Sequence, residues 1–306
     1  MAPDLDAVAV EAVPANAEAA WAAVVINYNA GAHLLDCVRS LRDDVSAGSP
    51  DIVVVDNGST DDSLAPIERD HLARVVLAPG NIGYARAANL GTAVARAPIV
   101  AVLNPDVVVG RGTAAAMCSA LAADPPIGAV GPEVVDATGA HYPSAREVPG
   151  VGTAIGHALL SHVRPENRWT RRYRQEAIDP TRARDADWVS GAAIWLRRAA
   201  LDDVGGWDER YFMFFEDVDL GTRLRTNGWR VVYEPKATVV HAEGVSRRSH
   251  PVRTTIEHHR AAYRFAASHW RGTKRVLLPA VAVLLACRAA GLVLAGRVAE
   301  ARLRGR

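Results

Sequence analysis

The stretch DIVVVDNGSTDD, residues 51–62, contains the pattern that decides the fold. Residues 52–55 form a short apolar run, which predicts a buried strand that stops at Asp56. Asn57 and Gly58 favour a turn, and Ser59 with Asp62 predicts a capping box for the next helix. The stretch therefore predicts a strand, a turn and a helix, with an acid at the end of the strand.

Similar patterns lie on both sides of this stretch. The run AAVVINYN starts at Ala22 and precedes apolar residues at helical spacing, and ARVVLA and PIVAVLNPD flank an Ala-rich segment, GYARAANLGTAVARA. This alternation over residues 22–131 predicts an α/β fold with a Rossmann-like, mostly parallel sheet flanked by helices. Ligands of such sheets bind at the carboxyl ends of the strands, where this chain places Asn27, Asn29, Asp56, Asn104 and Asp106.

A glycine- and asparagine-containing loop, PGNIGYARAANLG, adds a second polar signal. Gly80 and Gly83 permit close approach of the backbone to a ligand, and Asn81, Arg86 and Asn89 offer hydrogen-bond donors. A helix that begins here would favour an anionic phosphate at its N-terminus. A tight turn before a packed helix would explain the glycines but not the asparagines.

The tripeptide Asn104-Pro105-Asp106 ends another apolar run. It places a carboxylate where a divalent ion bridging a diphosphate needs a hard oxygen ligand, so Asp106 is the candidate ligand for Mg or Mn. The tripeptide alone is a common turn and carries little weight.

The stretch FFEDVDLGTRL, residues 214–224, places three acids beside aromatic residues. One of these carboxylates is a candidate general base, which would accept a proton from a reacting group. The alternative is an acidic helix N-terminus stabilised by the helix dipole, which would account for all three acids.

Composition and charge restrict the partners and the compartment. The net charge of +1 gives no reason to expect nucleic acid as a partner. Three separated cysteines suit a reducing compartment, and the first twenty residues lack the pattern of a secretion signal. We therefore expect a cytoplasmic protein, and the sequence leaves its oligomeric state open.

Residues 276–296 are apolar over about the length that a bilayer requires, but Pro279 and Arg288 interrupt them. Basic residues flank this segment on both sides. A helix that spans the membrane, one that lies on an anionic membrane surface and one that packs on the domain are all open, and the arginine and the flanking charge favour the second over the first.

The ordered motifs VVINYN, VVVDNGSTDDS, NIGYARAANLG, LNPD, SGAAIWLRR and GGWDERYFMFFEDVDLGTRL resemble those of family 2 glycosyltransferases with the GT-A fold. These are inverting enzymes that use nucleotide-diphosphate sugars. The resemblance implies that Asp217 is the catalytic base and that Glu216 orients the acceptor or Asp217, while Asp219 caps the helix or binds an arginine. It also implies that Asp56 holds the pyrimidine or ribose, and that Asp106 and His241 bind the divalent metal, Mg or Mn. The other residues expected at the nucleotide sugar are Asn27, Asn29, Asn57, Gly58, Asn81, Gly83, Tyr84, Asn89 and Asn104.

This chain departs from the family's DxD metal motif, because Asn104 stands at the first acidic position. An amide is a weaker ligand than a carboxylate, so a metal would be held less tightly or mainly through the diphosphate. Arg247 and Arg248, near His241, are further candidates for neutralising phosphate.

A closer resemblance, carried by HYPSAR, NRWTRRYRQE and DERYFMFFEDVDLG, is to bacterial rhamnosyltransferases that use dTDP-L-rhamnose and a polyprenyl-diphosphate-linked N-acetylglucosamine (GlcNAc) acceptor in cell wall synthesis. It implies a peripheral enzyme on the inner face of the cell membrane, whose basic middle region meets the lipid-linked diphosphate. The residues concerned are Arg146, Arg168, Arg171, Arg172 and Arg174. Another nucleotide sugar or acceptor, or a catalytically silent sugar-binding protein docked on the membrane, is the alternative.

These observations divide the chain into four parts. Residues 1–21 are expected to form a flexible N-terminal tail and residues 22–131 the nucleotide-sugar-binding half. Residues 132–250 are expected to form the acceptor-binding and catalytic half, and residues 251–306 a helical C-terminal segment of basic and apolar character that associates with the membrane.

Overall fold

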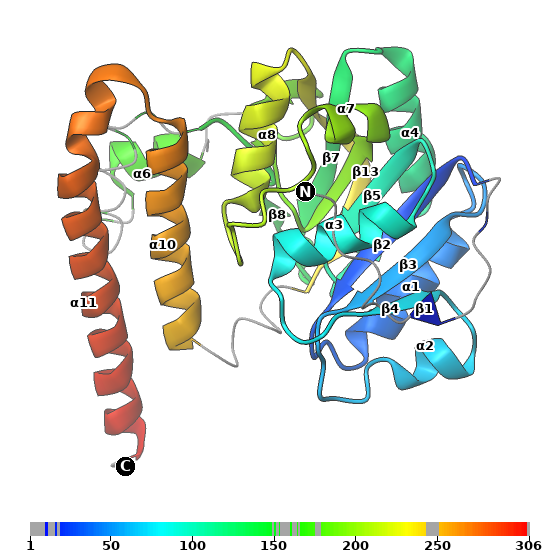
Figure 1. The fold of residues 1–306 in the computed structure, drawn as a ribbon, viewed down its shortest axis with the longest axis horizontal. Coiled ribbons are helices and arrows are strands. Elements are labelled where there is room, and N and C mark those ends of the chain that lie inside the picture. Colours follow the sequence, from blue (N-terminus) through cyan, green and yellow to red (C-terminus); the bar gives the residue numbers. More distant parts are fainter. Residues whose placement is uncertain are drawn as a thin grey trace.

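The computed structural model describes residues 10–11, 16, 19–148, 150, 153, 160, 164, 166–174, 179–242 and 251–304. A single large sheet forms the centre of the molecule, and helices cover it on both sides (Figure 1). The expected α/β fold is confirmed.

The first half of the chain builds the parallel part of this sheet. Four strands lie in the order β4-β3-β2-β5, with Asn27 of β2 aligned beside Asp56 of β3. The elements are β1 (Val10–Glu11), β2 (Trp21–Asn27), α1 (His33–Asp43), β3 (Asp51–Asp56), α2 (Ala65–Arg69), β4 (Arg74–Leu77), α3 (Tyr84–Val94) and β5 (Ile99–Leu103).

The second half extends the same sheet with a change of strand direction. Strand β12 runs antiparallel to both β5 and β7, and β13 returns parallel to β7. The elements are β6 (Val107–Val109), α4 (Thr113–Ala123), β7 (Ile127–Val135), β8 (His141–Tyr142), β9 (Ala145–Arg146), α6 (Arg168–Arg174), β10 (Arg184–Ala186), β11 (Trp188–Val189), β12 (Ala193–Arg197), α7 (Arg198–Asp203), α8 (Glu216–Thr226) and β13 (Arg230–His241). Residue 131, the boundary between the two halves that was expected from the sequence, lies within β7.

Alternate residues of the central strands supply two hydrophobic cores. Ala23 and Val25 of β2 belong to the core that includes residues of α1 and α4, whereas Ala22 and Val24 belong to the core that includes residues of α3, α7 and α8. A strand buried on both faces is apolar at every position, because neither face meets water. This explains the uninterrupted apolar runs in the sequence.

The capping box expected at Ser59 and Asp62 is not formed. Helix α2 begins at Ala65, after Leu64 and without a side-chain cap. The Ser59 hydroxyl instead accepts hydrogen bonds from the Asn29 N–H and from the Asn27 amide. The polar residues of this turn are therefore used to fix the loop above the sheet.

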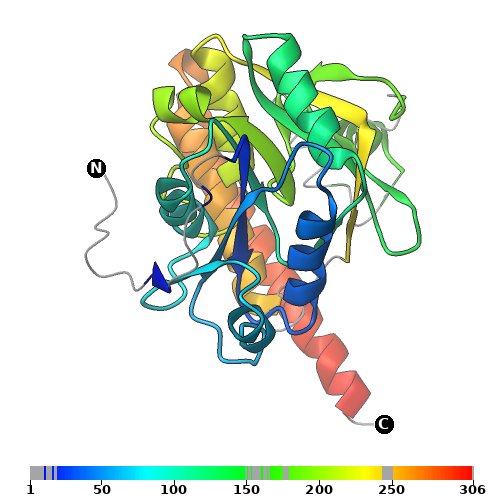
Figure 2. The same ribbon diagram turned by 90° about the vertical axis from the view of Figure 1, so that its right-hand side faces the viewer.

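The C-terminal segment is a helical hairpin beside the sheet domain. Helix α10 (Pro251–His269) and helix α11 (Leu278–Arg304) lie antiparallel and are joined by the 3-10 helix η2 (Gly272–Leu277) (Figure 1). The end of α11 projects beyond the rest of the fold (Figure 2). In the described part of the chain, residues 272–297 form one helical stretch with the length and apolar composition to cross a membrane, and only 6% of its most apolar window is buried. A helix with so little burial is not part of a protein core.

Replacement of Gly91 by alanine should destabilise the domain. A Cβ atom at Gly91 of α3 would lie 2.3 Å from Cγ1 of Val24 and 2.8 Å from Cγ2 of Val55, so the helix would have to move away from the sheet. We expect Gly91→Ala to lower the free energy of unfolding by about 1–3 kcal/mol, measured by urea denaturation.

Gly291→Ala is the matched control, because it adds a Cβ in the interior of helix α11 with no atom within 4 Å. It should leave stability unchanged or increase it by up to about 1 kcal/mol. Equal stability of the Gly91→Ala protein and the original protein would contradict the packing described here.

Candidate active site

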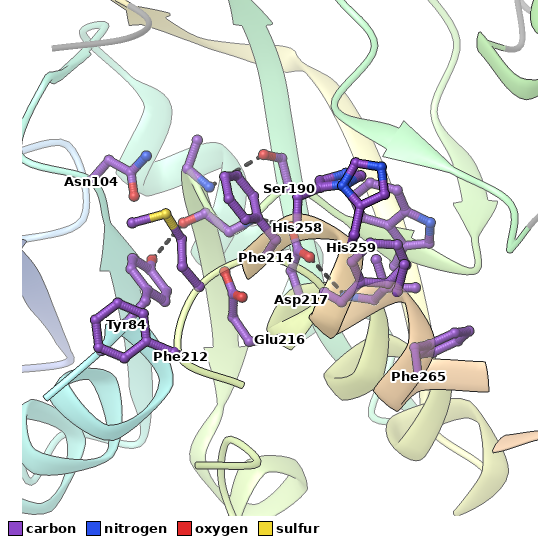
Figure 3. A pocket seen from close by; sticks show the side chains of 18 of the residues that line it. Tyr84, Asn104, Ser190, Phe212, Phe214, Glu216, Asp217, His258, His259 and Phe265 are labelled. Atoms are coloured by element: carbon purple, nitrogen blue, oxygen red, sulfur yellow. Dashed lines mark hydrogen bonds between the residues drawn. The ribbon is translucent and has the colours of Figure 1, made fainter. Parts of the chain in front are cut away.

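A cavity of about 650 Å³ opens beyond the carboxyl ends of β2, β3 and β5 and is closed on the other side by the start of α8 and by the C-terminal hairpin. It brings together nine of the residues expected from the sequence: Asn57, Asn81, Gly83, Tyr84, Asn104, Asp106, Glu216, Asp217 and His241. Five others lie outside its lining: Asn27, Asn29, Asp56, Gly58 and Asn89. In Figure 3, Glu216 and Asp217 occupy the centre of the view, between Asn104 and Tyr84 on one side and His258 and His259 on the other.

The residues outside the lining hold the loops that border the cavity. Asn27 is fully buried and donates to Asp56 Oδ1 at 2.8 Å and to Ser63 Oγ at 2.9 Å. The other carboxylate oxygen of Asp56 accepts the N–H of Ser59 at 3.0 Å. The Asn29 side chain similarly accepts the N–H of Thr60 at 2.7 Å. Asp56 is therefore held in one orientation at the end of β3.

Asn57 connects this turn to the glycine-containing loop. Its side-chain oxygen Oδ1 accepts the N–H of Ile82 at 2.8 Å, and its side-chain nitrogen Nδ2 donates to Asn81 Oδ1 at 3.3 Å. Gly58 has φ +78°, and a Cβ there would lie 2.7 Å from the backbone of Gly80. The two loops touch through their backbones, which only a glycine permits.

Asn89 joins helix α3 to the loop before α8. Its amide oxygen accepts the N–H of Trp207 at 2.8 Å, and its amide nitrogen donates to the carbonyl of Trp207 at 2.9 Å. The side chain is thus engaged with the 206–209 loop and is not among the residues that line the cavity. Asn89 of the motif NIGYARAANLG therefore links the two halves of the fold.

Asp106 and His241 meet in the lining of the cavity. Asp106 Oδ1 lies 3.1 Å from His241 Nε2, which is 3.3 Å from the Asn104 amide nitrogen, and both Asp106 and His241 are buried. Burial opposes ionisation of Asp106, but the hydrogen bond and charge of His241 outweigh it and hold the pKa of the carboxyl below its usual value. His241 reaches this place because β13 pairs with β6, with His241 opposite Val107.

This pair fits a divalent ion. Asp106 Oδ1 and His241 Nε2 lie side by side, so an oxygen and a nitrogen ligand would be available at one point of the cavity. Carboxylate oxygen suits Mg²⁺ or Mn²⁺, and imidazole nitrogen is a common ligand of transition-metal ions. Among the described residues no group of three or more His, Cys, Asp and Glu side chains is suited to hold a metal. An ion here would need further ligands from a bound substrate.

Two carboxylates stand together at the start of α8. Asp217 Oδ2 accepts the N–H of Gly191 at 3.0 Å and Asp217 Oδ1 accepts the N–H of Val218 at 2.8 Å. Glu216 is 8% exposed, and its Oε2 has no hydrogen-bond partner among the described residues. Asp217 therefore receives donors on both carboxylate oxygens, whereas Oε2 of Glu216 has none among the described residues.

The pKa values of the two acids follow from these surroundings. Burial raises the pKa of Asp217, while the two N–H groups and the positive charge of Arg146 oppose that rise. Burial and the negative charge of Asp217 raise the pKa of Glu216 well above its ordinary value. The pair thus favours an ionised Asp217 beside a protonated Glu216.

A strained turn presents this pair to the cavity. Phe214 and Phe215 precede α8 with φ of +69° and +64°, a left-handed conformation that costs about 1–2 kcal/mol for each residue. Both rings contact the imidazole of His258, at centroid distances of 5.3 and 5.6 Å. Helix α10 therefore supports the turn that aims the acids.

Sequence reasoning did not single out Gly191 and did not foresee how Arg146 is placed. The carbonyl of Gly191 accepts the Tyr84 hydroxyl at 2.6 Å, and its N–H donates to Asp217, so the backbone of one residue links the tyrosine to the acid. The Arg146 guanidinium lies 5.4 Å from the ring centre of Tyr142 and 5.5 Å from that of Trp188. Gly191 lies within the quoted motif SGAAIWLRR, but nothing in the motif indicates a contact with Asp217.

Asp219 binds an arginine, as expected, and also a histidine. Its Oδ2 accepts from Arg223 Nε at 2.6 Å, and its Oδ1 lies 2.7 Å from Nε2 of His269 at the end of α10. With only 1% of Asp219 exposed, this contact ties α8 to the C-terminal hairpin in a buried setting. Arg247 and Arg248, and the side chains of Arg172 and Arg174, lie outside the described residues.

Comparison with known proteins identifies the class. A model described as "Glycosyltransferase like family 2" matches residues 19–264. An N-acetylglucosaminyl-diphospho-decaprenol L-rhamnosyltransferase of Mycobacterium tuberculosis is 38% identical over 268 residues, which cover 83% of this chain and 86% of the relative.

Solved structures support the fold. A mannosyltransferase of Pyrobaculum calidifontis in complex with GDP-Man and Mn²⁺ aligns with a TM-score of 0.54 at 18% identity, over 91% of this chain and 79% of the other. GalNAc-T7 with UDP, GalNAc and Mn²⁺ aligns with a TM-score of 0.52 at 16% identity, over 72% and 43% of the two chains. Because the family model covers most of the chain, the protein belongs to glycosyltransferase family 2, with its GT-A fold, and is a glycosyltransferase.

Proposed function

We propose that the protein transfers L-rhamnose, with inversion, from dTDP-L-rhamnose to a polyprenyl-diphosphate-linked GlcNAc in cell-envelope synthesis. The observation that carries this proposal is the similarity to the mycobacterial L-rhamnosyltransferase along most of both chains. The cavity supports it, because polar loops suited to a nucleotide and a buried carboxylate pair suited to a base share one space.

The nucleotide of the donor lies across the carboxyl ends of β2 and β3. A carboxylate can accept about four hydrogen bonds. Asp56 accepts two, from Asn27 and Ser59, so it can still accept hydrogen bonds from the pyrimidine or ribose. Asn57, Asn81, Gly83, Tyr84 and Asn104 face the cavity and contact the rest of the donor. Asn27, Asn29, Gly58 and Asn89 act by holding the loops.

Asp106 and His241 would hold Mg²⁺ or Mn²⁺, with the donor diphosphate completing the coordination. When bound, such an ion neutralises charge that develops on the diphosphate as it leaves. Asn104 lies beside this pair and contacts His241 rather than supplying the carboxylate of a DxD motif.

Asp217 is the base. Its carboxylate accepts the proton of the acceptor hydroxyl as that oxygen bonds to the anomeric carbon of the donor. The bond between that carbon and the diphosphate oxygen breaks on the opposite face, which inverts the configuration. Protonated Glu216 orients the acceptor, and Tyr84 keeps Gly191 in place to donate to Asp217.

The enzyme works at the cytoplasmic face of the cell membrane, with α11 lying at the bilayer surface. The helix carries exposed apolar side chains, including Val283 and Leu294. Arg271, Lys274 and Arg275 are exposed beside its start and suit anionic lipid headgroups.

The proposal is tested by transfer from dTDP-L-rhamnose, UDP-glucose, UDP-galactose and GDP-mannose to synthetic polyprenyl-diphosphate GlcNAc with Mg²⁺ or Mn²⁺. We expect product from dTDP-L-rhamnose, with an anomeric configuration opposite to that of the donor when examined by NMR. Transfer of another sugar in its place would overturn the rhamnosyl assignment, and retained configuration would overturn the mechanism.

Asp217→Asn should lower kcat by about 10²–10⁴-fold, because the amide cannot accept the proton, while the Kd for dTDP-L-rhamnose stays within about twofold. Glu216→Gln is the matched comparison, since glutamine resembles the protonated acid, and it should retain activity within about tenfold. If the two variants exchanged these results, Glu216 would be the base.

Asp106→Ala should weaken metal-dependent binding of the donor. In calorimetric titrations, Mn²⁺ should lower the Kd for dTDP-L-rhamnose of the original protein. With Mn²⁺ present, the Kd of the Asp106→Ala variant should be about 10–100-fold higher than that of the original protein. Binding measured with a chelator present should be similar in both proteins. An equal response of both proteins to Mn²⁺ would remove Asp106 from the metal site.

Glu216→Gln should stabilise the protein more as pH rises. The folded state raises the pKa of Glu216 above its ordinary value of 4.5, so the folded chain binds this proton more tightly than the unfolded chain does. Stability from this group is complete below that value and is lost as pH rises toward the folded pKa. The gain in Tm of the variant should therefore be larger at pH 8 than at pH 5, and a gain independent of pH would argue against a protonated Glu216.

A further inference from the structure

The cavity that contains the two acids has an apolar part, which the C-terminal hairpin forms. The apolar side chains that the hairpin contributes to the lining are Ala262, Phe265, Ala266, Val281, Leu284 and Leu285. In Figure 3, Phe265 lies on the opposite side of Asp217 from Tyr84 and Asn104, which come from the sheet domain. The cavity therefore has a polar end at the sheet and an apolar end in the hairpin.

The packing of α10 against α11 explains why there is room between them. His259 of α10 lies 2.9 Å from Arg288 of α11, measured from Nε2 to Nη1. Because the helices are antiparallel and rise equally per residue, this register places Ala262 at the level of Leu285. One helical turn further along α10, the side chain is again a methyl group, at Ala266. Small side chains on α10 thus leave space in front of the larger ones on α11.

Aromatic contacts connect this apolar part to the turn that carries the acids. The ring of Phe215, which precedes Glu216, lies 5.7 Å from that of Phe265, measured between centroids. Phe265 is 8% exposed and belongs to a small core with Tyr211 and Val218. The apolar part is therefore fixed in position beside the carboxylate pair.

The buried histidine of this part of the hairpin has its partners within the hairpin. His259 Nδ1 lies 2.7 Å from the carbonyl oxygen of Thr255, and its Nε2 faces Arg288. Both ring nitrogens are engaged, so His259 does not require a polar ligand from the cavity.

We propose that the apolar part of the cavity binds the first prenyl units of the lipid-linked acceptor. The inference rests on the proposed function, in which a GlcNAc, a diphosphate and a prenyl chain follow one another in the acceptor. The reacting hydroxyl lies at Asp217, and the donor takes the side of the cavity that the sheet forms. The chain of the acceptor is then left with the side that the hairpin forms.

The chemistry of the lining favours a prenyl chain over other occupants. A sugar or a peptide backbone would lose its hydrogen bonds with water against these apolar side chains, whereas a hydrocarbon chain gains from leaving water. Helix α11 also carries Val283 and Leu294 as exposed apolar side chains, which the proposed function places at the bilayer. The same helix therefore meets the membrane on one face and the cavity on another, so a chain anchored in the bilayer reaches the cavity along an apolar surface.

The test compares GlcNAc-diphosphate carrying a farnesyl group with GlcNAc-diphosphate carrying a methyl group. Their Kd values are measured for the full chain in the same detergent micelles and without any donor. We expect the original protein to bind the farnesyl compound about tenfold or more tightly than the methyl compound, because the prenyl units are removed from water. No preference for the farnesyl compound would leave the apolar part to membrane lipid and overturn the inference.

Leu285→Trp and Ala262→Leu fill the space from opposite walls. Each should weaken binding of the farnesyl compound by about 10–100-fold and leave the Kd for the methyl compound within about twofold. Val283→Trp is the matched control, because Val283 lies on the same helix, is 64% exposed and is not among the residues that line the cavity. It should leave both Kd values within about twofold. Equal losses in Leu285→Trp and Val283→Trp would place the prenyl chain on the bilayer side of α11 instead.

The same measurements separate this inference from the proposed function. Unchanged affinity for the farnesyl compound in Leu285→Trp and Ala262→Leu, with rhamnosyl transfer intact, would overturn the inference alone. Failure of the original protein to bind either compound would overturn both. We expect dTDP-L-rhamnose to bind all three variants as it binds the original protein, because substitutions in the hairpin leave the sheet domain folded.

Discussion

The site depends on a charge constraint at the start of α8: two adjacent buried carboxyl groups cannot both ionise at low cost. The fold resolves this by giving Asp217 hydrogen bonds from the backbone of two other residues, while burial and the charge of Asp217 raise the pKa of Glu216. Gly191 and Val218 donate to Asp217, whereas Glu216 Oε2 has no partner among the described residues. Tyr84 secures Gly191 from the opposite side, so the donor half of the fold helps to decide which acid carries the charge.

The sequence predicted the sheet well because its information is local. Short uninterrupted apolar runs such as residues 52–55, bounded by turn residues, predict strands buried on both faces, and the structure confirms the α/β fold that they predicted. The direction of a side chain at a strand end is harder to predict, because the sequence is the same whether a polar residue there faces a ligand or a turn. Asn27 and Asn89 came from the same reasoning as Asn57 and Asn81, yet the former pair holds loops and the latter faces the cavity.

The acceptor side was least predictable, because its contacts join distant parts of the chain. Arg146, His258 and Arg288 line one cavity although 142 residues separate the first from the last. Helical spacing in α11 contains a signal in retrospect, since Arg288 shares a face with Val281, Leu284 and Leu285. From sequence alone this arginine interrupts an apolar segment and favours a helix on the membrane surface, but no local pattern shows that the cavity lies beside it.

The contact of Asp219 with Arg223 and His269 attaches the C-terminal hairpin to α8. Asp219 lies one helical turn from the start of α8, and His269 lies at the end of α10, immediately before the chain enters η2 and α11. If α11 rests on the bilayer, this buried contact sets the height of the carboxylate pair above the lipid surface. A lipid-linked substrate extends a fixed length from that surface. In the proposed function, the hairpin thus fixes the distance between the bilayer surface and the carboxylate pair, and the contact of Asp219 with His269 is its point of attachment.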